Sequence, residues 1–238
     1  KKLSLELGGK NPNIIFADCD FDEMLKTTVR SSFANQGQIC LCGSRILIQE
    51  SIYEKFKSAF VEKVEKMKVD DPANDRTKMG AVVSEQHMKK ILDYIEIARE
   101  EGGKVLCGGH RVKMEGELSQ GYYIQPTVIE GLDQNCRSNQ EEIFGPVVTI
   151  DSFTDENEAL QKANATPYGL AATVWTSDLS RAHRVAEHLE AGIVWVNCWL
   201  QRDLRTPFGG VKNSGLGREG GFEAMRFFTE PKNVCIKY

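Results

Sequence analysis

The sequence lacks four features that would each assign it to a particular class of protein. Its seven cysteines are scattered and form no CxxC pair, so neither a zinc site nor a redox centre is indicated. No apolar run approaches the ~20 residues of a membrane-spanning helix, and the first residues show no signal-peptide pattern. The 30 basic and 34 acidic residues are mixed, without a charged tail. We therefore expect free thiols in a reducing compartment, the cytoplasm, with no metal, nucleic-acid or membrane partner.

What the sequence does contain is enough apolar material for one large core or two modest ones. Of its 238 residues, 41% are hydrophobic and 27% are charged, which is typical of a globular protein. The chain opens without a methionine, on an apparent strand. We therefore expect it to be a piece of a longer protein.

Strand-like and helical segments alternate along the chain. Apolar, strand-like segments occupy residues 3–7, 13–17, 44–49, 104–107, 121–128, 147–153, 170–175 and 192–197. Helical patterns occupy about residues 22–34, a long segment capped by Ser51 and stopped by the Asp-Asp-Pro run at 70–72, and residues 84–101, 156–165 and 179–189. This alternation predicts an α/β fold in which helices flank a mainly parallel, twisted sheet.

Residues 215–220 match the GxGxxG pattern of dinucleotide-binding loops, but we reject that interpretation. The pattern binds a dinucleotide only between a strand and a helix of a βαβ unit, with an acidic residue about 20 positions later. Here it follows the loop at 207–210, and only 18 residues remain after it.

Cys40 and Glu6 are the two candidates for covalent chemistry. Cys40 lies between Gly37 and Gly43, which allow close backbone approach and can leave amides free as oxyanion donors. A thiol attacks only as thiolate and so needs a base. No histidine is near Cys40 in sequence, and Glu6, before a glycine pair, offers a carboxylate instead. A buried apolar role for Cys40 and a salt bridge for Glu6 are the alternatives.

Three further features have a structural and a functional interpretation each. Cys42 should face away from Cys40 on an extended segment, which favours a structural role, although the two could pair under oxidation. Residues 141–146 could form a plain turn before a strand, or could bring a carboxylate and an aromatic face together. Arg202 and Arg205 could be solvated surface charges, or could hold a carboxylate by paired hydrogen bonds.

Together, the order and spacing of these segments resemble the aldehyde dehydrogenase superfamily. The resemblance rests on residues 5–10, 37–40, 141–146, 207–210 and 214–219. It extends over the whole chain but only over the C-terminal, catalytic half of such an enzyme, because the family's Rossmann-type NAD domain precedes the Glu-Leu-Gly-Gly-Lys segment. Residues 31–37 and 197–204 look most like the aminomuconate and hydroxymuconate semialdehyde dehydrogenases.

The resemblance implies an NAD-dependent oxidation of an aldehyde to a carboxylic acid, with NADP left open. Cys40 would attack the aldehyde carbon to give a thiohemiacetal, whose oxyanion binds backbone N–H groups of the cysteine turn, and then a thioester. Glu6 would be the general base, with a pKa raised by partial burial. The implied cofactor-binding residues are Gly8, Glu142 and Phe144, and the implied substrate-binding residues are Arg202, for a distal carboxylate, and Phe208.

The resemblance also implies a domain division and an oligomer. Residues 1–8 would end the otherwise absent cofactor domain, residues 9–212 would form the catalytic domain, and residues 213–238 the C-terminal segment. Apolar residues alternate at 233–238, which predicts a strand that pairs across the interface of a homodimer or homotetramer. The other hypothesis is a catalytically silent fragment with a scaffold role. Whether the chain is active without the cofactor domain stays open.

Overall fold

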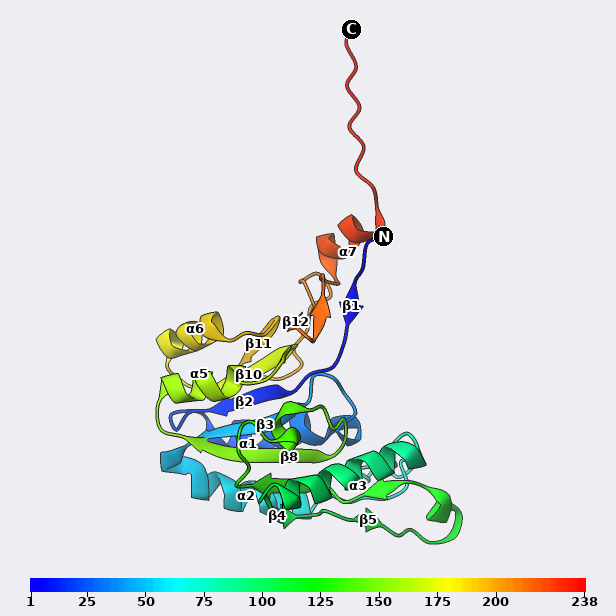
Figure 1. Cartoon of the computed structure of the whole chain (residues 1–238), viewed down its shortest axis with the longest axis vertical. Helices are drawn as coiled ribbons and strands as arrows, with labels where there is room; N and C mark the ends of the chain where they lie inside the picture. Colours follow the sequence, from blue (N-terminus) through cyan, green and yellow to red (C-terminus); the bar gives the residue numbers. More distant parts are fainter.

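The computed structural model describes all 238 residues and is built on a seven-stranded sheet of order β11-β10-β2-β3-β8-β7-β4 (Figure 1). The strands are β2 (Asn11–Ile15), β3 (Gly43–Gln49), β4 (Lys104–Cys107), β7 (Thr127–Glu130), β8 (Val147–Phe153), β10 (Ala171–Trp175) and β11 (Ile193–Val196). Every neighbouring pair is parallel except β4 with β7. The predicted α/β fold with a mainly parallel sheet is confirmed.

Helices cover both faces of this sheet. Strand β8 shows the division, because Val148 and Ile150 pack with one set of helices while Val147 and Phe153 pack with the other. The first face carries α1 (Phe21–Phe33) and α2 (Tyr53–Glu65). The second face carries α3 (Glu85–Glu100), α5 (Glu156–Asn164) and α6 (Leu179–His188). Burial on both faces explains why the strands read as continuous apolar runs.

Two sequence predictions of element boundaries are wrong. Ser51 does not cap α2, because Glu50–Ile52 form a short 3-10 turn (η2) and Ile52 precedes the helix without a side-chain cap. Residues 121–128 do not form one strand. Pro126 has no N–H to donate and separates β6 (Tyr123–Ile124) from β7.

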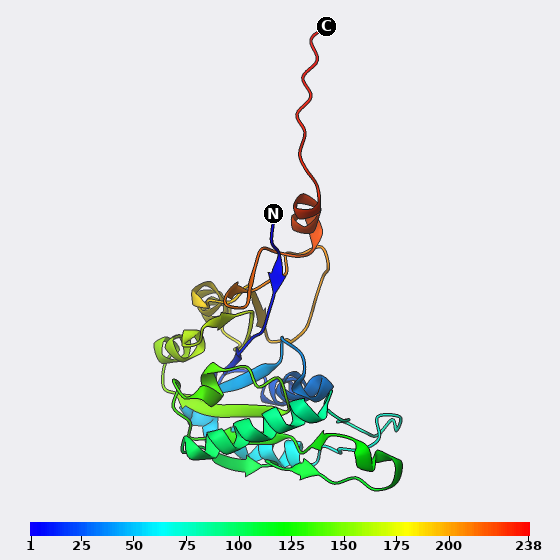
Figure 2. The same cartoon turned by 45° about the vertical axis from the view of Figure 1, so that its right-hand side comes forward.

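A small unit made from both ends of the chain projects from the sheet (Figures 1 and 2). Its strands β1 (Leu5–Glu6) and β13 (Gly215–Leu216) pair antiparallel, and α7 (Gly221–Phe228) follows them. Residues 229–238 extend away from the body and are exposed. The strand predicted at 233–238 is not formed within the chain.

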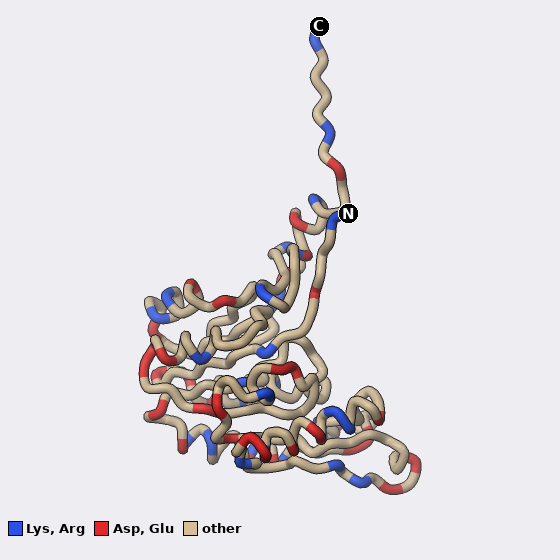
Figure 3. Tube along the Cα trace, in the orientation of Figure 1, with Lys and Arg blue, Asp and Glu red and all other residues tan.

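Short elements complete the connections. They are η1 (Ala34–Gly37), β5 (Arg111–Val112), η3 (Gly116–Gln120), α4 (Arg137–Gln140), β9 (Tyr168–Gly169) and β12 (Val211–Lys212). Basic and acidic residues are interspersed along the whole trace (Figure 3). None of the helices has both the length and the apolar composition to cross a membrane.

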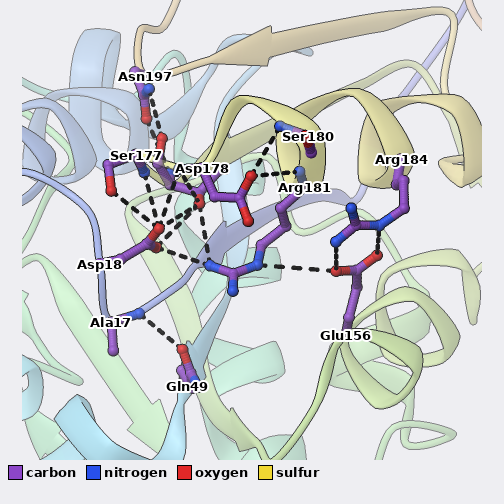
Figure 4. A network of polar contacts seen from close by, with 11 residues as sticks. Ala17, Asp18, Gln49, Glu156, Ser177, Asp178, Ser180, Arg181, Arg184 and Asn197 are labelled. Atoms are coloured by element: carbon purple, nitrogen blue, oxygen red, sulfur yellow. Dashed lines mark hydrogen bonds and ion pairs between the residues drawn. The ribbon is translucent and has the colours of Figure 1, made fainter.

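Asp18 ties the carboxyl end of β2 to the start of α6 (Figure 4). Its carboxylate accepts hydrogen bonds from the Thr176 hydroxyl, at 2.9 Å, and from the backbone N–H of Ser177 and of Asp178. It also forms a 3.0 Å ion pair with Arg181. These contacts lie at the sheet edge opposite to the one that carries Cys40, so they serve the fold.

Candidate functional site

Three of the predicted segments directly precede three neighbouring parallel strands. Residues 8–10 lead into β2, Cys40 lies just before β3, and residues 142–145 lead into β8. Because β2, β3 and β8 are adjacent and parallel, their amino ends lie at one edge of the sheet. The fold therefore brings together segments that are far apart in the sequence.

The chain reaches Cys40 through a left-handed turn. Asn35, Gln36 and Gly37 have φ angles of 49°, 58° and 69°, a region that only glycine adopts freely. At Gly37 a side chain has no room, since a Cβ would lie 2.1 Å from the carbonyl oxygen of Gly145. The cysteine turn thus packs directly on the segment that contains Glu142 and Phe144.

Asn11, the first residue of β2, holds the cysteine turn, and the sequence analysis missed it. Its side-chain amide donates to the carbonyls of Cys40, at 2.7 Å, and Cys42, at 2.9 Å, and its oxygen accepts from the Ala171 N–H. The Trp199 indole donates to the Leu41 carbonyl. The Cys40 N–H donates to no other residue of the chain. The only signal in the sequence was an asparagine two residues after a glycine pair.

The two cysteines of the turn have different surroundings. Cys40 is half-buried, and burial together with the Glu142 and Glu6 carboxylates raises the pKa of its thiol, partly offset by its own N–H and by Arg202. Cys42 is buried, which raises its pKa to about 12, and its Sγ faces the Ala34 carbonyl. Residues 40–42 form a turn and not the expected extended segment. At neutral pH the Cys40 thiol keeps its proton unless a base removes it.

Glu6 supplies a carboxylate close enough to influence that thiol. It lies in β1 opposite Gly215, its Oε2 is buried without a hydrogen-bond partner, and a Cβ on Gly209 would come within 2.9 Å of its Oε1. Burial and the nearby Glu219 raise the pKa of Glu6, while the Gly210 backbone and Arg218 act in the opposite direction. A carboxylate with one unpartnered oxygen and a raised pKa suits proton transfer.

The glycine pair after Glu6 forms a cradle for Glu142. The Gly9 N–H donates to Glu142 Oε1 at 2.9 Å. A Cβ on Gly8 would lie only 2.3 Å from Glu142 Oε2, so a side chain there would displace the carboxylate. Two residues further, Phe144 is half-buried and has a φ of 60°. Gly8, Glu142 and Phe144 thus lie together beside the cysteine turn.

Arg202 and Phe208 lie together on the other side of the cysteine. The Arg202 guanidinium carbon is 4.2 Å from the centroid of the Phe208 ring, and Arg202 forms no ion pair. Both residues line a cavity of about 130 Å³, with Trp195 and Glu219 among the other lining residues. Phe208 and Cys40 both pack against the same apolar cluster. Arg205 is exposed, as Arg202 is, but it pairs with Asp203.

Cys40 thus lies close to Glu6, whose Oε2 has no hydrogen-bond partner, and to Glu142 in its glycine cradle. The sequence profile of the aldehyde dehydrogenase family matches residues 1–234. The chain belongs to this family.

Named relatives match this chain over its whole length. The 2-aminomuconic semialdehyde dehydrogenase of Danio rerio is 50% identical over 240 residues, which cover 100% of this chain and 49% of the relative. The 2-hydroxymuconic semialdehyde dehydrogenase of Pseudomonas sp. (strain CF600) is 47% identical, with coverage of 100% and 49%. The chain thus spans about half the length of the curated relatives it matches.

Solved structures agree on the fold. The betaine aldehyde dehydrogenase of Staphylococcus aureus, crystallised in complex with NAD+, superimposes with a TM-score of 0.91 at 43% identity. The match covers 94% of this chain and 44% of that structure.

Proposed function

We propose that this chain carries the catalytic site of an NAD-dependent dehydrogenase that oxidises a carboxylate-bearing semialdehyde, such as a muconic semialdehyde, to the acid. The observation that supports this most is the meeting of Cys40, Glu6 and Glu142 at one edge of the sheet. The names of the relatives support the substrate class. A silent scaffold would not need a half-buried carboxylate with an unpartnered oxygen near a thiol, so that alternative is not favoured.

In the proposed first step the Cys40 thiol loses its proton to Glu6, and its sulfur attacks the aldehyde carbon. The carbonyl π electrons move to oxygen, and the Cys40 N–H, which donates to no other residue of the chain, donates to that oxyanion. The raised pKa of Cys40 makes an added base necessary, and the raised pKa of Glu6 makes this carboxylate a better one.

The residues at the edge of the sheet also fit the nicotinamide end of a dinucleotide. The Gly8–Gly9 cradle fixes the Glu142 carboxylate, whose Oε1 accepts from Gly9, so that Glu142 could accept ribose hydroxyls. Phe144 would pack near the ring. NAD, when bound, supplies the acceptor for the hydride that leaves the thiohemiacetal carbon. NAD and NADP share this end of the molecule, so either fits these residues.

Hydrolysis of the Cys40 thioester completes the proposed cycle. Glu6 removes a proton from a water molecule, the resulting hydroxyl adds to the thioester carbon, and the carbon–sulfur bond breaks to release the acid and the thiolate. The unpartnered Oε2 of Glu6 is free to accept that proton. One carboxylate can serve both steps if it releases the thiol proton to solvent before hydrolysis and returns the water proton to the Cys40 thiolate afterwards.

Arg202 is proposed to hold the distal carboxylate of the substrate. It has no ion pair in the chain, lies in the cavity beside Phe208, and lowers the pKa of both Cys40 and Glu6, which places its charge close to the reacting groups. We further propose that residues 9–212 form the catalytic domain and that the protein is a homodimer or homotetramer. We also propose the cytoplasm as its compartment, which the seven free thiols support.

The test uses this chain joined to the cofactor-binding half of the Danio rerio relative, with NADH absorbance as the signal. Arg202→Ala should raise KM for a carboxylate-bearing semialdehyde by roughly ten- to a hundredfold, the effect of losing a charged hydrogen-bond partner worth about 1.5–3 kcal/mol. An uncharged aldehyde of similar length should be nearly unaffected. Arg205→Ala, whose guanidinium already pairs with Asp203, is the matched control. Equal effects of Arg202→Ala on both substrates would contradict the assignment, and absence of NADH formation by the unaltered protein would contradict the activity.

A further inference from the structure

We propose that the first turns of α3 position the segment 142–145 against the cysteine turn, with His87 as the central positioning residue. We call His87, Lys90 and Ile91 the α3 clamp. Its consequence for the cofactor rests on the proposed function, whereas its effect on the segment 142–145 does not.

Phe144 needs such support because its backbone is strained. It is a non-glycine residue with a φ of 60°, a conformation that persists only where surrounding contacts enforce it. His87 Nε2 lies 2.6 Å from the Phe144 carbonyl oxygen. A carbonyl can only accept, so Nε2 carries the hydrogen. The two rings also meet edge to face, with centroids 6.1 Å apart.

The rest of the clamp holds the same segment on both sides of Phe144. Lys90 Nζ donates to the Glu142 carbonyl at 3.0 Å. A Cβ on Gly145 would lie 2.5 Å from Ile91 Cδ1, so this glycine sits directly on the helix. Three residues on one face of α3 thus contact three of the four residues between Glu142 and Gly145.

The same end of α3 is tied to the cysteine turn. The Val83 N–H donates to Gln38 Oε1 at 3.0 Å, just before the helix begins. Ser84 then caps the helix by accepting from the His87 N–H at 3.1 Å. Gln38 is two residues from Cys40, so residues 83–91 contact both the cysteine turn and the segment 142–145. The start of α3 therefore sets how Phe144 and Glu142 lie relative to Cys40.

Residue-resolved hydrogen exchange on the chain as it is, without cofactor, tests the clamp. Two amides report on the segment, because Gly9 donates to the Glu142 carboxylate and Val147 donates to the Gly145 carbonyl. His87→Phe keeps a ring but loses the donor, and it should speed exchange at both amides roughly tenfold, the factor that one ordinary hydrogen bond supplies. His87→Gln restores a donor and should recover most of the protection. His110→Phe removes a comparable histidine–carbonyl bond, to Gly108, outside the site and should leave both amides unchanged.

Unchanged exchange at Gly9 and Val147 in folded His87→Phe would overturn the proposal. An equal rise across the whole chain would also overturn it, because it would assign His87 to overall stability. If His87→Phe does not fold, Lys90→Met, which removes an exposed donor to the Glu142 carbonyl, gives the same test at Gly9.

A second measurement tests whether the α3 clamp affects NAD binding. It uses the chain joined to a cofactor-binding half. Calorimetric titration with NAD should give a Kd about tenfold higher for His87→Phe than for His110→Phe, with KM for the aldehyde unchanged. A change confined to KM for the aldehyde would overturn the cofactor-side role. Failure of the unaltered protein to form NADH would contradict the proposed function while leaving the exchange result intact.

Discussion

Cys40 and Cys42 are two positions apart, yet they differ in burial and in their charged surroundings. Cys42 is buried in the core and its thiol is held protonated by that burial, whereas Cys40 is half-buried beside two carboxylates. In a protein that carries the cofactor domain, we expect Cys40→Ala to abolish NADH formation and Cys42→Ala to keep most of it. The opposite pattern would show that the nucleophile had been misassigned.

Glu6 is expected to matter most for hydrolysis of the thioester. Its Oε2 has no partner in the chain, so it is free to take a proton from water. Glu6→Gln should therefore keep a pre-steady-state burst of NADH and slow turnover on the order of 10²–10⁴-fold, the range of general acid–base catalysis. Stopped-flow absorbance measures both. Loss of the burst without accumulation of thioester would argue that Glu6 is needed to form the thiolate.

The raised pKa of Glu6 also makes a prediction about stability and pH. Because burial makes the folded chain bind this proton more tightly than the unfolded chain does, the contribution of protonated Glu6 to stability is lost as pH rises through its folded pKa, above the ordinary value of 4.5. Glu6→Gln should thus raise Tm at pH 8 and change it little at pH 4. Calorimetry at the two pH values checks this, and a lower Tm at pH 8 would contradict it.

At the residue scale, the sequence revealed groups that carry chemistry but not those that position them. Cys40, Glu6 and Glu142 stand out because glycines flank or follow them. Asn11 and His87 do not, since their partners are 29 and 57 positions away and meet them only once the strand order is known. An asparagine at the start of a strand and a histidine in the first turn of a helix have many ordinary roles.

At the scale of elements, periodicity predicted most strands and helices because the strands are apolar on both faces and the helices on one. The errors occurred where a local interruption outweighed the pattern. Pro126 divides what reads as one strand, and a 3-10 turn at Glu50–Ile52 takes the place of the expected cap by Ser51. The site itself could be inferred only in part, because β2, β3 and β8 become neighbours through tertiary contacts.

The junction between β2 and α6 depends on one carboxylate. Burial raises the pKa of Asp18, but hydrogen bonds from Thr176 and Ser177 and the charge of Arg181 outweigh burial and lower it. Asp18→Ala should reduce the free energy of unfolding by about 1–2 kcal/mol, the lower range for a charged hydrogen-bond acceptor, because a third of its side chain is exposed.

Since the folded pKa of Asp18 is depressed, its contribution is present at neutral pH and is lost as pH falls below its ordinary value, near 4. Urea unfolding should show a larger difference between Asp18→Ala and the unaltered chain at pH 7 than at pH 3. Asp75→Ala, at an exposed position whose carboxylate accepts no hydrogen bond, is the control. An equal loss at both pH values would assign the effect to packing.

At the scale of the whole molecule, one end of the chain exposes apolar surface that the rest of the fold does not cover. On α7, Phe222, Met225 and Phe228 are between 63% and 82% exposed. Beyond the helix, Val234, Ile236 and Tyr238 are also exposed, in an extended segment without a partner (Figure 1). Their alternation places all three on one face, as in a strand with one buried side. An extended segment with free backbone groups pairs readily with a sheet edge of another copy.

We therefore expect residues 233–238 to add to a sheet across a subunit interface. Replacing both Val234 and Ile236 by lysine should lower the mass measured by light scattering, because the two side chains belong to the face that would become buried. Replacing Asn233 and Cys235 by lysine adds the same charge on the opposite face and should change the mass less. Deletion of residues 233–238 should lower the mass as the replacement of Val234 and Ile236 does. An oligomer unchanged by that deletion would mean that this segment forms no part of the interface.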